Sequence, residues 1–352
     1  MDPLDFLIKI LKIYSPSTKE KELSDFIYSY AKGLGFKDVT QDQANNVIVS
    51  ASEGRPLIYL IGHMDTVPGE LPVFYDGTNV YGRGAVDAKS ALSAFLFSSL
   101  SLKDLGCGLK FIAVTDEERL SEGMKEIIKR EQRPDYAVFG EPTGLTGIAV
   151  SYKGRLLAKL SFSAKPYHSS SPPEGKTAFD LMIEAVNEIY LKVKSLNSES
   201  TSHFDSVTAQ VVKCSCGDST NKTPSLAESY IDIRVPPRFK TEELEELLLK
   251  GKNYSVEDRL EAFYTPPTNE LPRAFYRGIY KVLREKASFV RKLGTCDGNV
   301  LRSYYDVPAI AYGPGESKLS HTDEERVPVR DFLESIEVVK ESIKELCKSF
   351  NR

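Results

Sequence analysis

Residues 57–68 have the sequence Leu-Ile-Tyr-Leu-Ile-Gly-His-Met-Asp-Thr-Val-Pro. The apolar run 57–61 has the length of a buried strand, and the glycine and proline that follow mark its end. His63 and Asp65 are therefore expected at the carboxyl end of a strand, the edge at which open α/β sheets carry their chemistry. Because a single histidine at a strand end is more often structural, the interpretation of His63 depends on which other side chains reach the same edge.

Length and composition indicate an ordinary globular protein with two domains. The 352 residues exceed the size at which one hydrophobic core usually stops growing. The net charge of −4 argues against nucleic acid as a partner, because phosphate binding needs a basic patch. No apolar run approaches the roughly 20 residues that cross a bilayer. We therefore expect neither a nucleic-acid nor a membrane partner.

The cysteines and the first residues favour a cytoplasmic protein with free thiols. The five cysteines are an odd number in a long chain, and the spacing of Cys214 and Cys216 is too close for a zinc knuckle. Asp2 and Asp5 stand where a signal peptide would carry positive charge.

Helix and strand signals alternate along the first 140 residues. Asp2 and Pro3 open a helix through about Leu11, and a capping-box pattern at 17–20 opens a second helix that ends near residue 33 or 35. Further strands are expected at 46–50, 57–61 and 109–115 and one ending at 138–139, with a helix over 88–105. Strands separated by helices predict an α/β fold with a mostly parallel mixed sheet and helices on both faces.

The pattern changes near residue 153. Three segments alternate like half-buried strands, and two helices lie between and after them: 157–162, 206–212, 229–235, 177–193 and 242–250. Two helices on one antiparallel sheet form a small α+β domain. The last part of the chain returns to alternating helix and strand signals, with a helix expected at 273–285, a strand at 307–311 and a helix at 329–348. We predict one domain from 1–152 and 265–352, interrupted by an inserted domain at 153–264.

Four further segments place polar residues after an expected strand or at a helix start. They are Tyr-Gly-Arg-Gly-Ala-Val-Asp at 81–87, Asp-Glu-Glu at 116–118, Gly-Glu-Pro at 140–142, and Gly-Pro-Gly-Glu at 313–316 followed by Ser-His-Thr-Asp at 320–323. Taken singly, they have structural explanations: a helix-capping aspartate, solvated acidic turns and a structural histidine. The first lacks the third glycine of a dinucleotide fingerprint, which argues against a nicotinamide dehydrogenase.

Taken together, the segments predict a metal site. Imidazole and carboxylate are the ligands expected for zinc and similar divalent ions, and two histidines with three carboxylates suit two ions that share one carboxylate. The candidate ligands are His63, Asp87, Glu118, Glu141 and His321. Glu117, beside a ligand, is a candidate proton acceptor, and Asp65 is a candidate to orient the ring of His63.

These motifs, in this order, resemble those of the co-catalytic zinc aminoacylases and carboxypeptidases, the family of acetylornithine deacetylase and succinyl-diaminopimelate desuccinylase. The resemblance covers nearly the whole chain. It implies two divalent ions per subunit, with Zn²⁺ expected and Co²⁺ the alternative. It also implies a cis peptide bond between Asp87 and Ala88.

The resemblance further implies a role for each ligand. His63 and Glu141 would hold one ion, and Glu118 and His321 the other. Asp87 would bridge the two ions, and Glu117 would be the general base in amide hydrolysis.

The inserted domain resembles the lid and dimerisation domain of that family, which implies a homodimer. His168, in Lys-Pro-Tyr-His-Ser-Ser at 165–170, matches a histidine that enters the neighbouring subunit's active site and stabilises the oxyanion. Asn221 and Arg234 match residues that bind the free carboxylate of the substrate. The alternatives are a surface histidine and an exposed salt bridge.

Residues 291–300 and 312–317 look most like the carrier-protein lysine/ornithine hydrolases. Those enzymes release lysine or ornithine from the C-terminal glutamate of a small acidic amino-group carrier protein in lysine and arginine biosynthesis. Asp297 and Glu316 are then expected to face the cationic side chain.

Other functions remain open at this point. Acetylornithine deacetylase, succinyl-diaminopimelate desuccinylase and a small-peptide peptidase share the motifs. A non-catalytic carrier-binding module is an alternative of another class; it predicts the loss of at least one ligand, and all are present.

Overall fold

The computed structural model describes residues 1–36, 38–103, 105–172 and 174–350. It divides into two compact units. Unit 1 comprises Met1–Ser151, Tyr264–Arg291 and Cys296–Arg352, and unit 2 comprises Tyr152–Phe263 and Lys292–Thr295. The sequence predicted that the inserted domain comprises only residues 153–264. Unit 2 also includes the short segment Lys292–Thr295.

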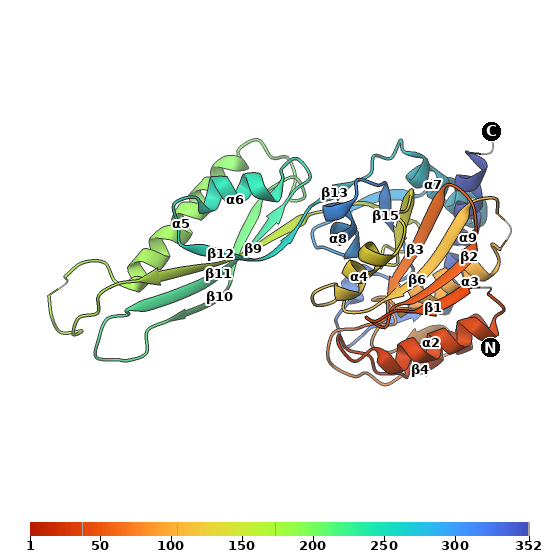
Figure 1. The fold of residues 1–352 in the computed structure, drawn as a ribbon, viewed down its shortest axis with the longest axis horizontal. Helices are drawn as coiled ribbons and strands as arrows, with labels where there is room; N and C mark the ends of the chain where they lie inside the picture. The colour runs from red at the N-terminus through yellow and green to blue at the C-terminus, as the bar shows by residue number, and fades with distance from the viewer. Residues whose placement is uncertain (37, 104, 173, 351–352) are drawn as a thin grey trace. The chain divides into compact units, whose positions relative to one another are not determined.

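The main sheet has nine strands in the order β1-β2-β6-β3-β7-β15-β8-β13, with β14 paired to β8 (Figure 1). These strands are β1 (Asp38–Gln41), β2 (Val47–Ser52), β3 (Leu57–His63), β6 (Gly108–Val114), β7 (Tyr136–Phe139), β8 (Gly147–Tyr152), β13 (Phe263–Tyr264), β14 (Ser288–Lys292) and β15 (Ala309–Ala311). The central strands β6, β3, β7 and β15 are parallel, whereas β1, β2 and β8 form antiparallel pairs. The predicted mostly parallel mixed sheet is therefore confirmed.

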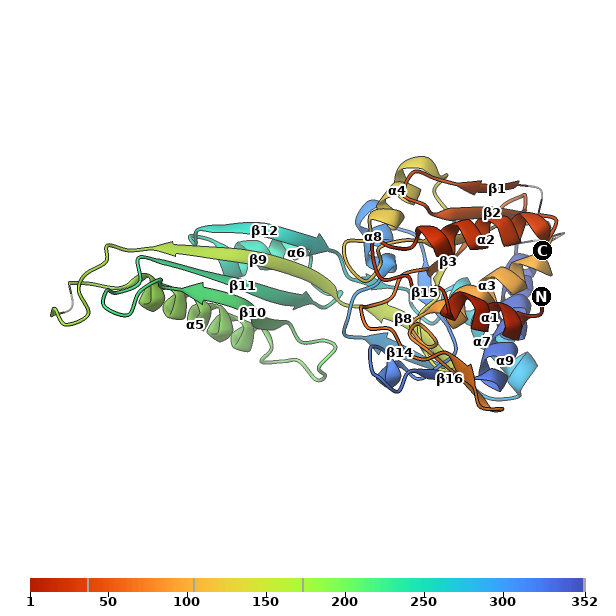
Figure 2. The same cartoon turned by 90° about the horizontal axis from the view of Figure 1, so that it is seen from below.

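Helices cover both faces of this sheet. They are α1 (Pro3–Leu11), α2 (Lys21–Gly33), α3 (Lys89–Leu100), α4 (Glu122–Arg130), α7 (Glu270–Leu283), α8 (Asp297–Tyr304) and α9 (Val329–Lys348). Strand β3 is buried along its whole length. Ile58 and Leu60 join the core that contains α1, α3, α7 and α9 (Figure 2). Tyr59 and Ile61 alternate with them and point to the opposite face, because successive side chains of a strand alternate.

Short elements complete unit 1. They are the strands β4 (Phe74–Tyr75), β5 (Asn79–Tyr81) and β16 (Arg326–Pro328), which form a small sheet in the order β16-β5-β4, and the 3₁₀ helix η1 (Ser317–Leu319). The pairing of β16 with β5 connects the C-terminal part of the chain to the segment that precedes Asp87.

Of the two predicted helix caps near the N-terminus, the structure confirms the first and contradicts the second. As predicted, Asp2 caps α1 by accepting a hydrogen bond from the N–H of Asp5. The capping box predicted at 17–20 is wrong: α2 begins at Lys21 with no side-chain cap. Instead, the Ser17 hydroxyl donates to Asp65 Oδ2 at 2.7 Å. A tertiary contact has therefore replaced the local cap that the pattern favours.

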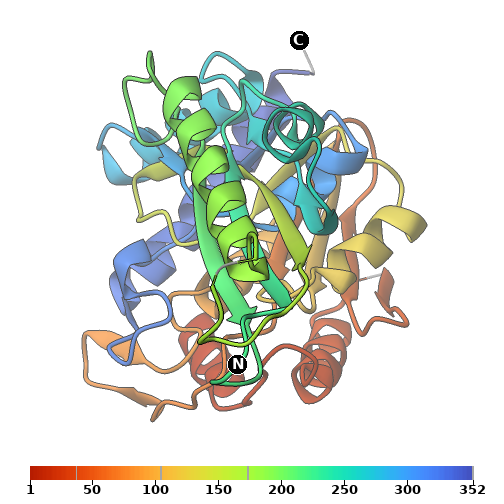
Figure 3. The same ribbon diagram turned by 90° about the vertical axis from the view of Figure 1, so that its left-hand side faces the viewer.

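Unit 2 is an antiparallel sheet with two helices, as expected. Its strands follow the order β10-β11-β9-β12, and the elements are β9 (Gly154–Ser163), β10 (Thr208–Cys216), β11 (Leu226–Val235), β12 (Tyr254–Leu260), α5 (Ala178–Leu196) and α6 (Thr241–Leu249). Figures 1 and 3 show α5 lying along one face of this sheet. Leu156, Leu160 and Ile231 pack into the core under the helices.

The cysteines depart from the expectation of free thiols. Cys107, just before β6, and Cys347, in α9, form a disulfide with their Cα atoms 6.0 Å apart. The pair is 240 residues apart in the sequence, so spacing gave no indication of it. Cys214, Cys216 and Cys296 are free.

Among the described residues, none of the helices combines the length and the apolar composition needed to span a bilayer.

Candidate metal centre

The polar loops predicted to meet do so at the carboxyl ends of the parallel strands of unit 1. His63 is the last residue of β3, Glu117 and Glu118 follow β6, and Glu141 follows β7. Asp87 lies just before α3. The peptide bond between Asp87 and Ala88 is cis, as the resemblance implied.

The glycines that precede these loops let α3 pack closely against the sheet. A Cβ atom at Gly62 would lie 3.0 Å from the Cα of Leu92, and one at Gly313 would lie 2.7 Å from the Cβ of Ala91. Larger residues would push α3 outward, and with it Asp87 at its start. The glycine before His63 is therefore part of how the site is assembled.

The carboxylate of Asp87 lies between two imidazoles. Its Oδ1 is 3.3 Å from Nε2 of His63, and its Oδ2 is 3.3 Å from Nε2 of His321. Nε2 of His321 also lies 2.9 Å from Oε1 of Glu118. One carboxylate that presents an oxygen to each histidine is the arrangement expected of a bridging ligand between two metal ions.

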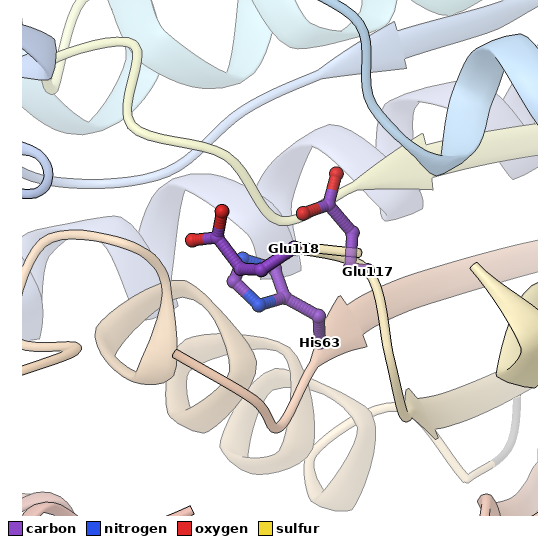
Figure 4. Close-up of side chains that lie close together, drawn as sticks. All are labelled: His63, Glu117 and Glu118. Atoms are coloured by element: carbon purple, nitrogen blue, oxygen red, sulfur yellow. The ribbon is translucent and has the colours of Figure 1, made fainter. Parts of the chain in front are cut away.

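Two groups of donor atoms have the compactness of metal sites. Within the described part of the chain, the donor atoms of His63, Glu117 and Glu118 lie within 4.8 Å of one another, and so do those of Asp87, Glu118 and His321. Figure 4 shows the first group, with His63 at the end of its strand and both glutamates from the neighbouring loop. The second group contains the residues that the resemblance implied for one ion and for the bridge. The first contains Glu117 where the resemblance implied Glu141.

The imidazole of His63 is prepared for a ligand. Its Nδ1 lies 3.0 Å from the backbone oxygen of Asp65, whereas its buried Nε2 forms no hydrogen bond. A hydrogen bond at Nδ1 fixes the tautomer whose Nε2 carries a lone pair, and metal-binding histidines are held in this way. A buried nitrogen that faces a carboxylate at 3.3 Å without a hydrogen bond fits a divalent cation.

The pKa values show the repulsion that a cation would relieve. Burial, together with the charge of Asp87, raises the pKa of Glu141 to about 8. Burial and then Glu141 raise the pKa of Glu117 well above its usual value. Hydrogen bonds to Asp87 and Glu118 raise the pKa of His321 to about 10. In the absence of metal, protons on these groups take the place of the cation.

The carboxylate of Asp65 holds the loop that carries Glu117 and Glu118. Its Oδ1 accepts the N–H of Glu117 at 3.1 Å, and its Oδ2 accepts the N–H of Glu118 at 3.0 Å. The sequence predicted that Asp65 orients the ring of His63. In the structure the hydrogen bond to that ring comes from the backbone oxygen of Asp65, and its carboxylate, 3.6 Å from Nδ1, serves the neighbouring loop.

Two residues that sequence reasoning missed hold the same loops. The carboxylate of Glu20 accepts the N–H of Asp116 at 2.9 Å. Glu325 Oε1 accepts the N–H of Asp87 at 3.0 Å. Glu20 closes the pattern at 17–20 that was interpreted as a capping box, and Glu325 ends the acidic run 323–325, which is typical of a solvated surface.

The two candidates for binding a cationic side chain differ in their surroundings. Asp297 is buried at the start of α8, and its Oδ1 has no hydrogen-bond partner. Burial raises its pKa to about 7. Glu316 is exposed and lies 2.5 Å from the ammonium of Lys318. Asp297 therefore keeps an open acceptor, whereas Glu316 is already paired.

The remaining candidates lie in unit 2. His168 is on an exposed loop, where its Nδ1 is 2.8 Å from the hydroxyl of Ser170. The backbone oxygen of Asn221 accepts the N–H of Ser169, so the loops of His168 and Asn221 are adjacent. Arg234, on β11, forms an ion pair with Asp232 through its Nε at 2.8 Å.

An α/β sheet that carries paired histidine–carboxylate groups at its carboxyl edge defines a metallohydrolase type of site. Comparison of this chain with known protein families and structures agrees with this class. The model of peptidase family M20/M25/M40 matches residues 59–345. The chain belongs to this family, whose members are metal-dependent hydrolases.

Related proteins match over almost the whole chain. A Pyrococcus furiosus protein with the provisional name LysW-lysine/LysW-ornithine hydrolase is 34% identical over 348 residues, covering 99% of this chain and 98% of its own. The LysW-lysine hydrolase of Deinococcus radiodurans is 31% identical over 358 residues, covering 97% and 96%.

Solved structures share the fold. A tripeptidase from Staphylococcus aureus has a TM-score of 0.81 at 21% identity, with 98% of each chain covered. A Bacillus subtilis dinuclear metal-binding peptidase of the M20 family has a TM-score of 0.73 at 12% identity, again with 98% of each chain covered.

We predict that the metal-free protein becomes less stable as the pH rises from about 5 to about 10. The folded state raises the pKa of Glu141 from 4.5 to about 8 and that of His321 from 6.5 to about 10. A group whose pKa is raised by folding stabilises the folded state below its unfolded pKa, and this contribution is lost as the pH passes the folded pKa. The melting temperature is measured as a function of pH in two samples, one with a chelator and one with Co²⁺. It should fall with rising pH only in the sample with the chelator.

Replacement of His321 by asparagine should flatten this fall between pH 6.5 and about 10. Replacement of His203, which lies outside the site, is the matched control. A melting temperature of the metal-free protein that rises over the same range would contradict the prediction.

Proposed function

We propose that this chain hydrolyses the amide bond between the C-terminal glutamate of a small acidic amino-group carrier protein and lysine or ornithine. The observation that carries the hydrolytic chemistry is Asp87, whose two oxygens face the two histidines at 3.3 Å each. The substrate class rests on the names of relatives that match nearly the full length of the chain. The deacetylase, desuccinylase and peptidase alternatives share the motifs, and a tripeptidase shares the fold, but the relatives described above have the name of a carrier-protein hydrolase.

We propose two ions per chain, Zn²⁺ first and Co²⁺ as the alternative. Asp87 would bridge them, Glu118 and His321 would hold one, and His63 would hold the other with Glu141. The compact group of Asp87, Glu118 and His321 supports this arrangement, and so does Nε2 of His63, which forms no hydrogen bond and faces Asp87. When bound, such ions supply Lewis-acid activation of the scissile carbonyl and of a water molecule.

Glu117 is the proposed general base. Its carboxylate lies within 4.8 Å of the donor atoms of His63 and Glu118, next to the proposed ligands. Asp65 holds its backbone, so the carboxylate stays next to the ligands without being required as one. Glu117 accepts a proton from the attacking water and returns it to the departing α-amine of lysine.

Unit 2 is proposed as the lid and dimerisation unit. Arg234 is bound to Asp232 through Nε and Nη2, which leaves Nη1 for the free carboxylate of the substrate, and Asn221 would assist. His168 would stabilise the oxyanion in the active site of the partner subunit.

A homodimer is supported by the surface of unit 2. Strand β10 is at the edge of its sheet. Phe179, Ile183 and Leu191 on α5 are 45%, 43% and 67% exposed. An open strand edge beside exposed apolar side chains is typical of a surface that pairs with another chain.

Asp297 is the proposed partner of the cationic side chain of lysine or ornithine, because its buried Oδ1 lacks a partner. Glu316 remains the second candidate and would have to exchange Lys318 for the substrate.

The substrate proposal predicts preferential release of lysine or ornithine from a carrier protein whose C-terminal glutamate carries it. The purified, metal-loaded protein is assayed on this conjugate and, at equal concentration, on acetylornithine and succinyl-diaminopimelate. A higher kcat/KM for the conjugate is expected. A higher value for either small substrate would reject the carrier protein as the acyl donor.

The Glu117→Ala variant should bind both metal ions and lose about 10²–10⁴-fold in kcat, the usual contribution of a general base. Metal content by elemental analysis and turnover are measured on the same preparation. Glu122→Ala, on the exposed start of α4, is the control. If Glu117→Ala kept substantial turnover, another group would have to be the base.

The trans role of His168 predicts complementation between two inactive variants. When His168→Ala and Glu117→Ala are mixed and allowed to exchange subunits, random pairing should restore about one quarter of wild-type activity. Each heterodimer then contains one complete site. Absence of recovery, with heterodimers verified by mass spectrometry, would contradict catalysis in trans.

A further inference from the structure

The turn that ends in Asp87 is held by one oxygen atom. The N–H groups of Gly84, Val86 and Asp87 each lie 3.0 Å from Oε1 of Glu325. Gly84 has a φ of +87°, a conformation that favours glycine and turns its N–H inward. Three backbone donors therefore converge on a single acceptor from a segment about 240 residues further along the chain.

The three N–H groups and their acceptor are shielded from solvent. Glu325 is 1% exposed, so its carboxylate is inaccessible to solvent. Buried N–H groups need a partner, and an anion satisfies several of them at once. One oxygen of Glu325 thus fixes the direction of three N–H groups, and with them the backbone from which the Asp87 side chain extends.

The second oxygen of Glu325 connects this turn to the loop of His321. Oε2 lies 3.1 Å from Nη1 of Arg83, and the same Nη1 donates to the backbone oxygen of Thr322 at 2.9 Å. Thr322 directly follows His321. Arg83 is itself 7% exposed, so this connection is also shielded from solvent.

We propose that Glu325, together with Arg83, is a positioning residue that sets where the Asp87 carboxylate lies between His63 and His321, and thereby the affinity of the site for its metal ions. Glu325 neither binds an ion nor touches the substrate in this account. This inference rests on the proposed two-metal centre. It adds a residue that controls metal affinity by holding a ligand in place.

A role limited to fold stability makes a different prediction. If Glu325 only anchored β16 to β5, its loss would lower the melting temperature of the metal-free protein and leave the metal affinity of the folded molecules unchanged. If it positions Asp87, metal affinity falls in molecules that remain folded, and high metal concentrations restore activity because the ligands and Glu117 are intact.

The test compares Glu325→Ala and Glu325→Gln with the same replacements of Glu324. Glu324 is the adjacent carboxylate, and its side chain is 80% exposed. Each metal-free full-length protein is titrated with Co²⁺ and Zn²⁺ by calorimetry against a competing chelator, and kcat and KM are measured at several metal concentrations. We expect Glu325→Ala to bind ions about 10–100-fold more weakly, the usual effect of losing a group that orients a ligand. The Glu324 variants should match the wild type.

If Glu325→Ala does not fold, the Glu325→Gln variant distinguishes the positioning role from a role in fold stability alone. Its amide oxygen can still accept the three N–H groups, but its NH₂ group cannot pair with Arg83. An intermediate loss of metal affinity, with a near wild-type melting temperature of the metal-free protein, is expected.

The possible failures are distinguishable. A wild-type protein that binds no divalent ion rejects the metal centre itself. A wild type that binds two ions, with folded Glu325 variants that bind them equally well, rejects only the positioning role.

Discussion

The contact on which the rest of the site depends is the carboxylate of Asp87 between the imidazoles of His63 and His321. Each of its oxygens faces one ring at 3.3 Å, and Glu118 joins the second ring at 2.9 Å. Burial, together with the negative groups that crowd this edge of the sheet, raises the pKa of Glu141 to about 8. A protein maintains such crowding only where positive charge is supplied, either by protonated histidines or by metal ions. The parallel strands, the close approach of α3 and the buried loops all serve to bring these groups together.

Carboxylates outside the proposed set of ligands hold the loops that carry this set. Asp65 receives the N–H groups of Glu117 and Glu118, Glu20 receives that of Asp116, and Glu325 receives three from the turn of Asp87. Burial raises the pKa of Glu20 and of Glu325, and hydrogen bonds from the backbone act against this rise. The irregular loops thus gain the rigidity that secondary structure provides elsewhere, and the proposed ligand atoms stay close to one another.

The sequence was sufficient to predict the class of fold and which loops meet, and it was insufficient wherever a long-range contact decided the outcome. The apolar run 57–61 and the strands after it predicted a parallel sheet, and parallel strands end at one edge, so His63, Asp87 and His321 could be brought together in advance. The pattern at 17–20 was misread because Ser17 bonds to Asp65 rather than to its own helix. Glu325 and the Cys107–Cys347 pair were missed, since their partners lie 238 to 241 and 240 residues away. No local pattern carries that information.

The account is tested most directly by anomalous diffraction from crystals of the metal-loaded protein, recorded on both sides of the zinc or cobalt absorption edge. It predicts two anomalous peaks per chain, about 3.5–4 Å apart, with one oxygen of Asp87 bound to each. A single peak, or two peaks of which one lacks Asp87 as a ligand, would contradict the claim that this carboxylate bridges a two-metal centre.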